Sequence, residues 1–151
     1  MKTLVVLATV LLTPAVWGAD PLIGTWKVNL DKSKYDPGPP PKVSTAVFSE
    51  DGDFIVLKVD TADAQGQSHS LSSRWKKDGK DYALTGSTTT DALAAKRVND
   101  RITDFTYKKG GKVISNARVV VSRDGKAVTT SHKGTNAEGK PFHNQVTWEK
   151  Q

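Results

Sequence analysis

The chain has 151 residues, a formal net charge of +6 and no cysteine. The absence of cysteine excludes thiolate catalysis, thiolate metal ligation and c-type haem attachment, so a folded domain must be held by packing alone. Most lysines are spread over predicted turns and do not form a patch with interleaved aromatic residues. The charge therefore indicates a solvated surface, and no nucleic-acid partner is predicted.

The first 18 residues have the pattern of a secretory signal peptide. Lys2 precedes an unbroken apolar run over residues 4–12, and Pro14 and small residues follow it. A membrane-spanning helix needs about 20 apolar residues and this run has roughly half that number, so no stable membrane anchor is expected. The preference for small residues at the cleavage site favours cleavage after Gly18. The sequence predicts a signal peptide over residues 1–18 and a periplasmic or secreted location.

Residues 19–151 have the size of one domain with a single core. Short runs rich in Val, Thr, Ile, Phe and Trp alternate with turns rich in Gly, Asp and Asn, and no segment carries a helical apolar stripe. This pattern predicts strands joined by hairpins, and Asp51-Gly52, Asp78-Gly79 and Asp124-Gly125 suit two-residue turns. The predicted strands lie at residues 22–30, 42–50, 53–61, 68–77, 80–86, 91–98, 101–109, 112–122, 126–133 and 141–149.

Successive hairpin-connected strands leave two unpaired edges unless the sheet closes on itself. We therefore predict an all-β fold, an antiparallel up-and-down meander closed into an 8–10-stranded lipocalin-like barrel. An ungapped match of residues 45–76 with 118–149, which aligns Trp75 with Trp148, also favours a repeating meander. Apolar residues occupy both faces of the predicted strand over residues 54–59. Either a small covering element or dimerisation would bury the outer face, so the protein is expected to be a monomer or a weak dimer.

The segment 31–42 interrupts this rhythm with four prolines. Proline lacks a backbone donor and is excluded from central strands, so the segment is predicted to be a stiff loop. Such a loop is either a simple crossing between the first two strands or a lid over the mouth of the barrel. Because proline-rich linkers are common connectors, the simple crossing is favoured.

Two short motifs carry a resemblance to known proteins. Gly24-Thr25-Trp26-Lys27, at the start of the first predicted strand, resembles the opening of the calycins, which include the lipocalins and the fatty-acid-binding proteins. The ending Trp148-Glu149-Lys150 is similar to that of many fatty-acid-binding proteins. The resemblance implies a barrel whose closed end is plugged by Trp26 and whose interior binds a small apolar or amphipathic molecule.

The chain also departs from that pattern. Val146 stands where fatty-acid-binding proteins carry an arginine that grips a carboxylate, so this anion clamp is missing. The whole stretch from Gly24 onward also resembles a family of uncharacterised exported proteins of soil bacteria. That resemblance implies a bacterial source and supplies no activity.

Candidate ligand-binding residues follow from the alternation of side chains along strands, with Trp26 setting the inner face. Buried polar groups need partners, so polar and aromatic side chains on inner faces can pair internally or contact a ligand. An ion pair with Asp91 or Asp100 at a barrel end is the alternative for Arg97, because arginine is rarely buried unpaired. The predicted ligand-binding residues are His69, Trp75, Tyr82, Arg97, Phe105, Tyr107 and His132.

No metal site, cofactor or catalytic residue is predicted. The three histidines, His69, His132 and His143, lack the paired spacing of metal ligands, and parity points His143 outward. No nucleophile elbow, phosphate loop or dinucleotide fingerprint occurs. A carrier is therefore the main hypothesis. The alternatives are a hydrolase or isomerase on the same barrel, with Asp104 and His132 as the first acid–base pair to test, and a filled structural barrel.

Overall fold

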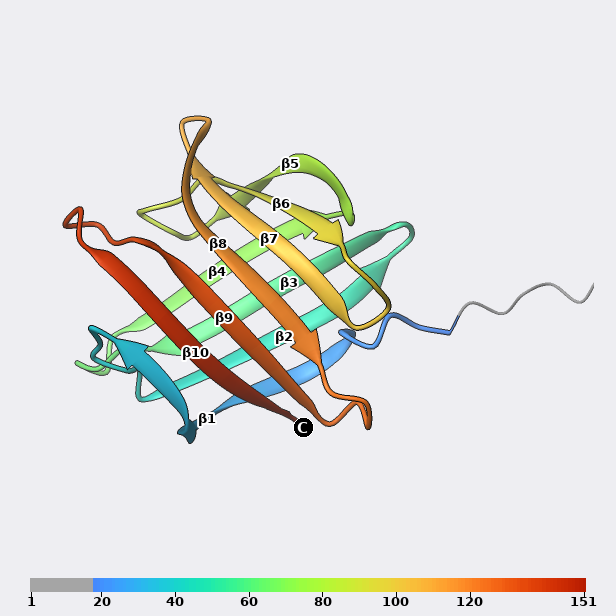
Figure 1. Ribbon diagram of the computed structural model, residues 1–151, viewed down its shortest axis with the longest axis horizontal. Coiled ribbons are helices and arrows are strands. Elements are labelled where there is room, and N and C mark those ends of the chain that lie inside the picture. Colours follow the sequence, from blue (N-terminus) through green and yellow to red (C-terminus); the bar gives the residue numbers. More distant parts are fainter. Residues whose placement is uncertain (1–17) are drawn as a thin grey trace, which may run out of the picture.

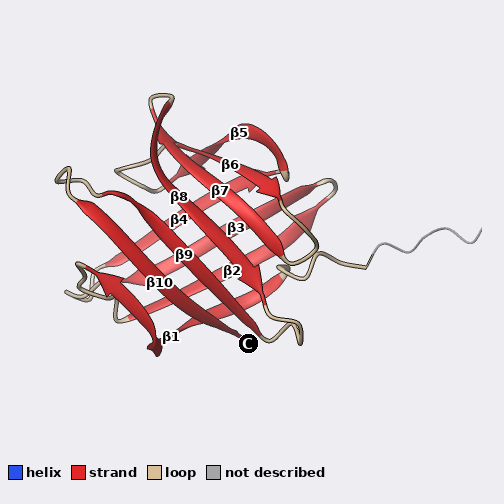
Figure 2. Ribbon diagram, in the orientation of Figure 1, coloured by secondary structure: helices blue, strands red, loops and turns tan. Residues whose placement is uncertain are grey.

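The computed structural model describes residues 18–151, so the predicted signal peptide lies, except for Gly18, outside the described residues. These residues form ten strands (Figures 1 and 2), and none of them forms a helix long and apolar enough to cross a membrane. The strands are β1 (Gly24–Asp36), β2 (Val43–Asp51), β3 (Phe54–Ala62), β4 (Ser68–Trp75), β5 (Asp78–Thr85), β6 (Ala92–Arg97), β7 (Ile102–Lys109), β8 (Lys112–Val121), β9 (Ala127–Thr135) and β10 (Pro141–Lys150).

The sheet is a closed antiparallel barrel, as predicted from the sequence. Each strand pairs with the next along the chain, and β1 closes the barrel by pairing with both β2 and β10. In Figure 1, β7 to β10 form a wall in front of β2, β3 and β4, and the strands of the two walls cross. Closure gives every strand a neighbour on both sides, although the contact between β4 and β5 is short.

The first strand is longer than predicted. β1 continues through the segment 31–36 and pairs with β10 at Lys34, Tyr35 and Asp36, after an irregularity that follows Asn29. These residues all keep their backbone donors, and the first proline of the segment is Pro37. The prediction of a loop from residue 31 is therefore wrong for 31–36, and only 37–42 connects β1 to β2.

The turn predicted at Asp78-Gly79 is also absent. Asp78 opens β5 and pairs with Lys96 of β6, while β4 and β5 pair only at two positions near Ser72 and Ser73. Lys77, just before β5, forms an ion pair of 2.6 Å with Asp20. The chain thus crosses from β4 to β5 in a wide path tied to the N-terminal segment, because contacts distant in sequence outweigh the local turn preference.

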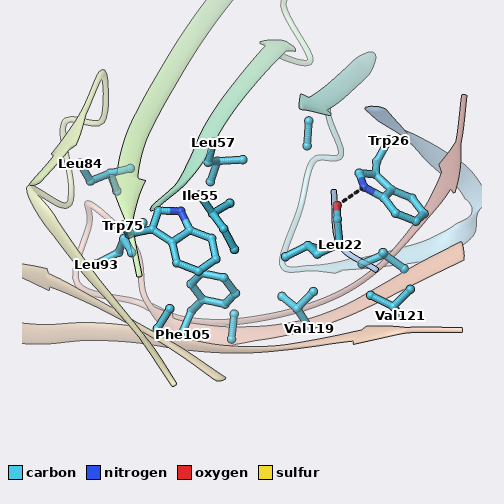
Figure 3. Packing of buried hydrophobic residues seen from close by; sticks show 14 residues of the cluster. Leu22, Trp26, Ile55, Leu57, Trp75, Leu84, Leu93, Phe105, Val119 and Val121 are labelled. Carbon is cyan, nitrogen blue, oxygen red and sulfur yellow. Dashed lines mark hydrogen bonds between the residues drawn. The ribbon is translucent and has the colours of Figure 1, made fainter. Parts of the chain in front are cut away.

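The closed end of the barrel is plugged by Trp26 and Leu22, each 1% exposed. The indole Nε1–H of Trp26 donates a hydrogen bond of 2.9 Å to the backbone oxygen of Leu22, as Figure 3 shows. Ala46, Val121 and Val128 belong to the same buried cluster. The position of Trp26 agrees with the one that the calycin resemblance implied.

Burial along the strands follows the predicted alternation. Ile55 and Leu57 are buried, whereas Phe54, of opposite parity, is only partly buried. The guanidinium of Arg74 lies 3.4 Å from the centroid of the Phe54 ring, and Lys76 also lies over it. The apolar residue of the second face is thus covered by long cationic side chains of the same chain.

Candidate functional site

The barrel encloses a cavity of about 540 Å³. Its walls come from inward-facing positions on both sides of the barrel, because alternate side chains of each strand point to the interior. The apolar residues that line it include Trp26, Ala46, Leu57, Phe105, Val119, Val128 and Trp148. The interior is therefore not a filled core, and a volume of this size suits a small organic molecule.

The proline-rich connection and several turns lie at one end of the cavity. Tyr35, Pro37, Gly38 and Pro39 line it, together with Thr89 and Thr90 from the β5–β6 turn and Asn136 from the β9–β10 turn. Both turns lie on the left in Figure 1, at the end of the barrel opposite the start of β1. The segment predicted as a simple crossing thus also lines the mouth of the barrel. This is the position expected for the alternative, a lid over the mouth.

One wall carries a continuous series of aromatic rings. Trp75 packs edge-on against Phe105 at 5.0 Å between centroids (Figure 3), and Phe105 stacks with Tyr107 at 6.2 Å. Tyr107 lies 5.2 Å from the ring of His132, which packs edge-on against Phe142 at 4.9 Å. We call these five residues the aromatic wall. It runs from the core to the mouth.

The polar groups of this wall are neutral. The Nε2 atom of His132 is hydrogen bonded to the Oγ of Ser115 at 2.9 Å, and burial lowers the pKa of His132 to about 4. Burial also raises the pKa of Tyr107 to about 12, and no hydrogen bond contributes to that shift. At neutral pH the wall therefore presents an uncharged imidazole and a phenol whose hydroxyl is available as a donor.

The structure places four of the seven predicted ligand-binding residues in the aromatic wall. Phe105, Tyr107 and His132 line the cavity. Trp75 supports Phe105 from the core, is 0% exposed and does not line the cavity. The Nε1 atom of Trp75 is the one buried side-chain polar atom without a hydrogen-bond partner in the described part of the chain.

The other three predicted residues are not brought to the cavity. His69 is exposed and pairs with Asp63 at 2.8 Å. Arg97 forms an ion pair with Asp100 at the opposite end of the barrel, which is the alternative that the sequence left open. The hydroxyl of Tyr82 donates a hydrogen bond of 2.6 Å to Asp78. The alternation of side chains predicted that His69 and Arg97 point inward. Each lies near the end of its strand, where the side chain is exposed to solvent.

Sequence reasoning missed many of the polar and aromatic residues that line the cavity, and four of them are Tyr35, Ser115, Phe142 and Asn144. Parity could have found three of them, because Ser115 alternates with the buried Ala117 and Val119, and Phe142 and Asn144 share the parity of Trp148. Tyr35 could not be found in this way, since the irregularity in β1 breaks the alternation after Asn29.

The acid–base pair considered in the sequence is not formed. Asp104 lies on the outer face of β7, where its carboxylate accepts two hydrogen bonds of 2.7 Å from Arg118. His132 faces the cavity on β9, and no aspartate or glutamate is among the cavity-lining residues of the described chain. Within residues 18–151 no group of three His, Cys, Asp or Glu residues could hold a metal ion.

No family model and no curated protein sequence matches the chain. Among solved structures, the crystal structure of Rv2717c from M. tuberculosis is similar over 92% of this chain and 98% of its own, with a TM-score of 0.58 and 15% identity. Zebrafish ileal bile acid-binding protein complexed with cholic acid is similar over 87% and 99%, with a TM-score of 0.56 and 12% identity. The fold of this chain is a calycin-like β-barrel.

Proposed function

We propose that this protein is an exported carrier that binds a small apolar or amphipathic molecule inside its barrel. The observation that carries the proposal is the cavity of about 540 Å³, which has an apolar lining and turns gathered at one end. Ligand sites of drug-sized molecules have volumes of roughly 300–1,000 Å³ and are mostly apolar with a few placed polar groups. The aromatic wall and the Ser115–His132 pair fit that description.

The likeness to a bile acid-binding protein supports the same class of function, because that protein holds an organic ligand, cholic acid, in a barrel of this fold. The proposal of export rests on the secretory pattern of residues 1–18, and it places the carrier in the periplasm or outside the cell. A monomer suffices for binding, since one chain encloses the cavity.

Native mass spectrometry of the protein purified from its own host tests the carrier. The control is the same sample after unfolding, extraction and refolding. We expect a bound mass that is lost on unfolding, and its value identifies the ligand class. A host-purified sample without bound mass, and with no change in melting temperature across a set of lipids and aromatic compounds, would contradict the proposal.

An enzyme is the weaker alternative on this geometry. The Ser115–His132 pair has the distance of a nucleophile and its base. However, an imidazole with a pKa of about 4 is too weak a base to take the proton of a serine hydroxyl at neutral pH, and no carboxylate among the described residues that line the cavity orients it. Hydrolysis of neutral esters that is lost in Ser115→Ala, with the fold intact, would restore this alternative.

A further inference from the structure

The cavity contains no formal charge. Among the residues of the described chain that line it there is no aspartate, glutamate, lysine or arginine. Two charged residues considered for the site in the sequence are paired outside the cavity lining: Arg97 with Asp100, and Asp104 with Arg118. Val146, on the inward face of β10, is buried and apolar. A ligand inside the barrel therefore meets no counter-ion.

The cavity also offers hydrogen-bonding groups, and four of them lie on the neighbouring strands β7 to β10. Ser115 and His132 satisfy each other at 2.9 Å. Within residues 18–151, no hydrogen bond contributes to the pKa of the Tyr107 hydroxyl, next to them on the aromatic wall, so this hydroxyl can donate to a ligand. Asn144 accepts a backbone hydrogen bond of 3.2 Å from Asp36, which leaves its amide hydrogens for a second partner. The deeper walls, at Leu57, Val119 and Val128, are apolar.

Burying an ion in such surroundings is unfavourable. Moving an ionised carboxylate or ammonium group from water into a site without a counter-ion costs far more free energy than neutral hydrogen bonds can offset. A hydroxyl or carbonyl oxygen, in contrast, needs only one or two donors, which Tyr107 and Asn144 can supply. We propose that the cavity takes an uncharged, largely apolar molecule whose hydroxyl or carbonyl oxygen accepts a hydrogen bond from Tyr107, and that it discriminates against carboxylates and ammonium ions. This inference rests on the proposed carrier function.

The titration of the wall is consistent with this selectivity. Burial holds the pKa of His132 at about 4 and that of Tyr107 at about 12. His69 and His143, the other two histidines, are exposed, with Asp63 and Ser131 as their respective partners. Neither His132 nor Tyr107 therefore carries a charge near neutral pH.

Two matched pairs of probes test the inference by isothermal titration calorimetry on the refolded protein. The first pair is 1-dodecanol and dodecanoate, and the second is naphthalene-2-methanol and 2-naphthoate. We expect an alcohol to bind at pH 8 with at least tenfold higher affinity than its acid. Because only the neutral acid would enter, the apparent affinity for the acid should rise about tenfold for each unit of pH lowered from 8 to 6, while that for the alcohol stays constant.

Three outcomes are distinguishable. Binding of the alcohol, together with an affinity for the acid that rises as the pH is lowered, supports the inference. An acid that binds as tightly as its alcohol at pH 8, with no pH dependence, overturns the inference and leaves the carrier standing. Binding of none of the four probes counts against the carrier itself, and with it the inference.

Tyr107→Phe tests the assigned donor. Removing the hydroxyl should weaken binding of the alcohol about fivefold, the effect of one lost hydrogen bond. Tyr82→Phe is the matched control, because it removes a phenol hydroxyl that donates to Asp78 and does not line the cavity. Equal affinities of wild type and Tyr107→Phe would overturn the assignment of Tyr107, and circular dichroism confirms that both variants are folded.

Discussion

The imidazole of His132 is joined to the hydroxyl of Ser115 by a 2.9 Å hydrogen bond across the β8–β9 pair. This bond holds a titratable ring in the barrel wall, where burial lowers its pKa from 6.5 to about 4. In the unfolded chain the ring binds a proton near pH 6.5, so between these two values the unfolded state carries more protons than the folded state. Stability is therefore complete above about pH 6.5 and falls as the pH drops toward 4.

We predict a pH-dependent loss of stability that His132→Leu abolishes. The full window corresponds to about 3 kcal/mol in the free energy of unfolding. Urea unfolding at intervals between pH 7.5 and 4.5 measures it, and His143→Gln, which changes an exposed histidine on the outer face of β10, should keep the wild-type slope. The slope would then belong to His132, whereas an unchanged slope in His132→Leu would assign it to other groups.

Carboxylates contribute at lower pH and can be separated from this effect. Hydrogen bonds from His69, Arg118 and Asn29 lower the pKa values of Asp63, Asp104 and Glu149, respectively. A carboxyl group whose pKa is lowered on folding stabilises the folded state at pH values above its pKa in the unfolded chain. This stabilisation is lost as the pH falls below that pKa. Since carboxyl groups of the unfolded chain titrate near pH 4, the loss of stability that they cause begins where the loss caused by His132 is nearly complete.

Gly134 allows β9 to approach β8 closely beside this pair. It lies opposite Ser115, and a Cβ at Gly134 would stand 2.3 Å from the Cβ of Ser115 and 2.4 Å from the backbone oxygen of Ile114. Gly134→Ala should push the strands apart and lower the free energy of unfolding by about 2 kcal/mol or more. Chemical denaturation checks this value.

Gly139→Ala is the control for that substitution. Its Cβ would meet no atom within 4 Å, although its φ of 77° makes any side chain strained. We expect a loss of about 1 kcal/mol, from the backbone alone. If Gly134→Ala is no more destabilising than Gly139→Ala, the close approach of β8 and β9 is not tight.

Two neighbouring threonines of β9 face opposite sides of the barrel wall. Thr130 lines the cavity, whereas Thr129 is exposed on the same strand. Thr130→Trp should fill space that a ligand needs and lower the affinity for 1-dodecanol at least tenfold. Thr129→Trp adds the same ring outside the barrel and should leave the affinity within twofold of wild type. Calorimetry compares them, and equal affinities in both variants would place the ligand outside the cavity.

Arg97 and His69 should not contribute to binding, although the sequence made both candidates. Each is exposed and engaged with a carboxylate, Asp100 and Asp63 respectively, outside the cavity lining. We expect Arg97→Ala and His69→Ala to bind 1-dodecanol within twofold of wild type. A tenfold loss in either variant would return that residue to the site.

Much of this architecture is determined by local features of the sequence. The alternation of side chains gave the inner faces of most strands, Asp51-Gly52 and Asp124-Gly125 located two hairpins, and Gly24 to Lys27 marked the closed end. The match between residues 45–76 and 118–149 also has a structural counterpart, since β3 and β9 occupy equivalent positions in it. All of these signals act within a few residues, through the two-residue period of a strand and the backbone needs of a turn.

Only the tertiary structure decided which inward side chains reach the cavity. His69 and Arg97 share the inward parity of Tyr107 and His132, but closure of the barrel leaves the first two at opposite ends. The stagger between strands sets the height of each residue in the wall, and it depends on pairings distant in sequence. The same closure draws Tyr35 and Pro37 to the mouth and brings Ser115 to His132, contacts that no local pattern encodes.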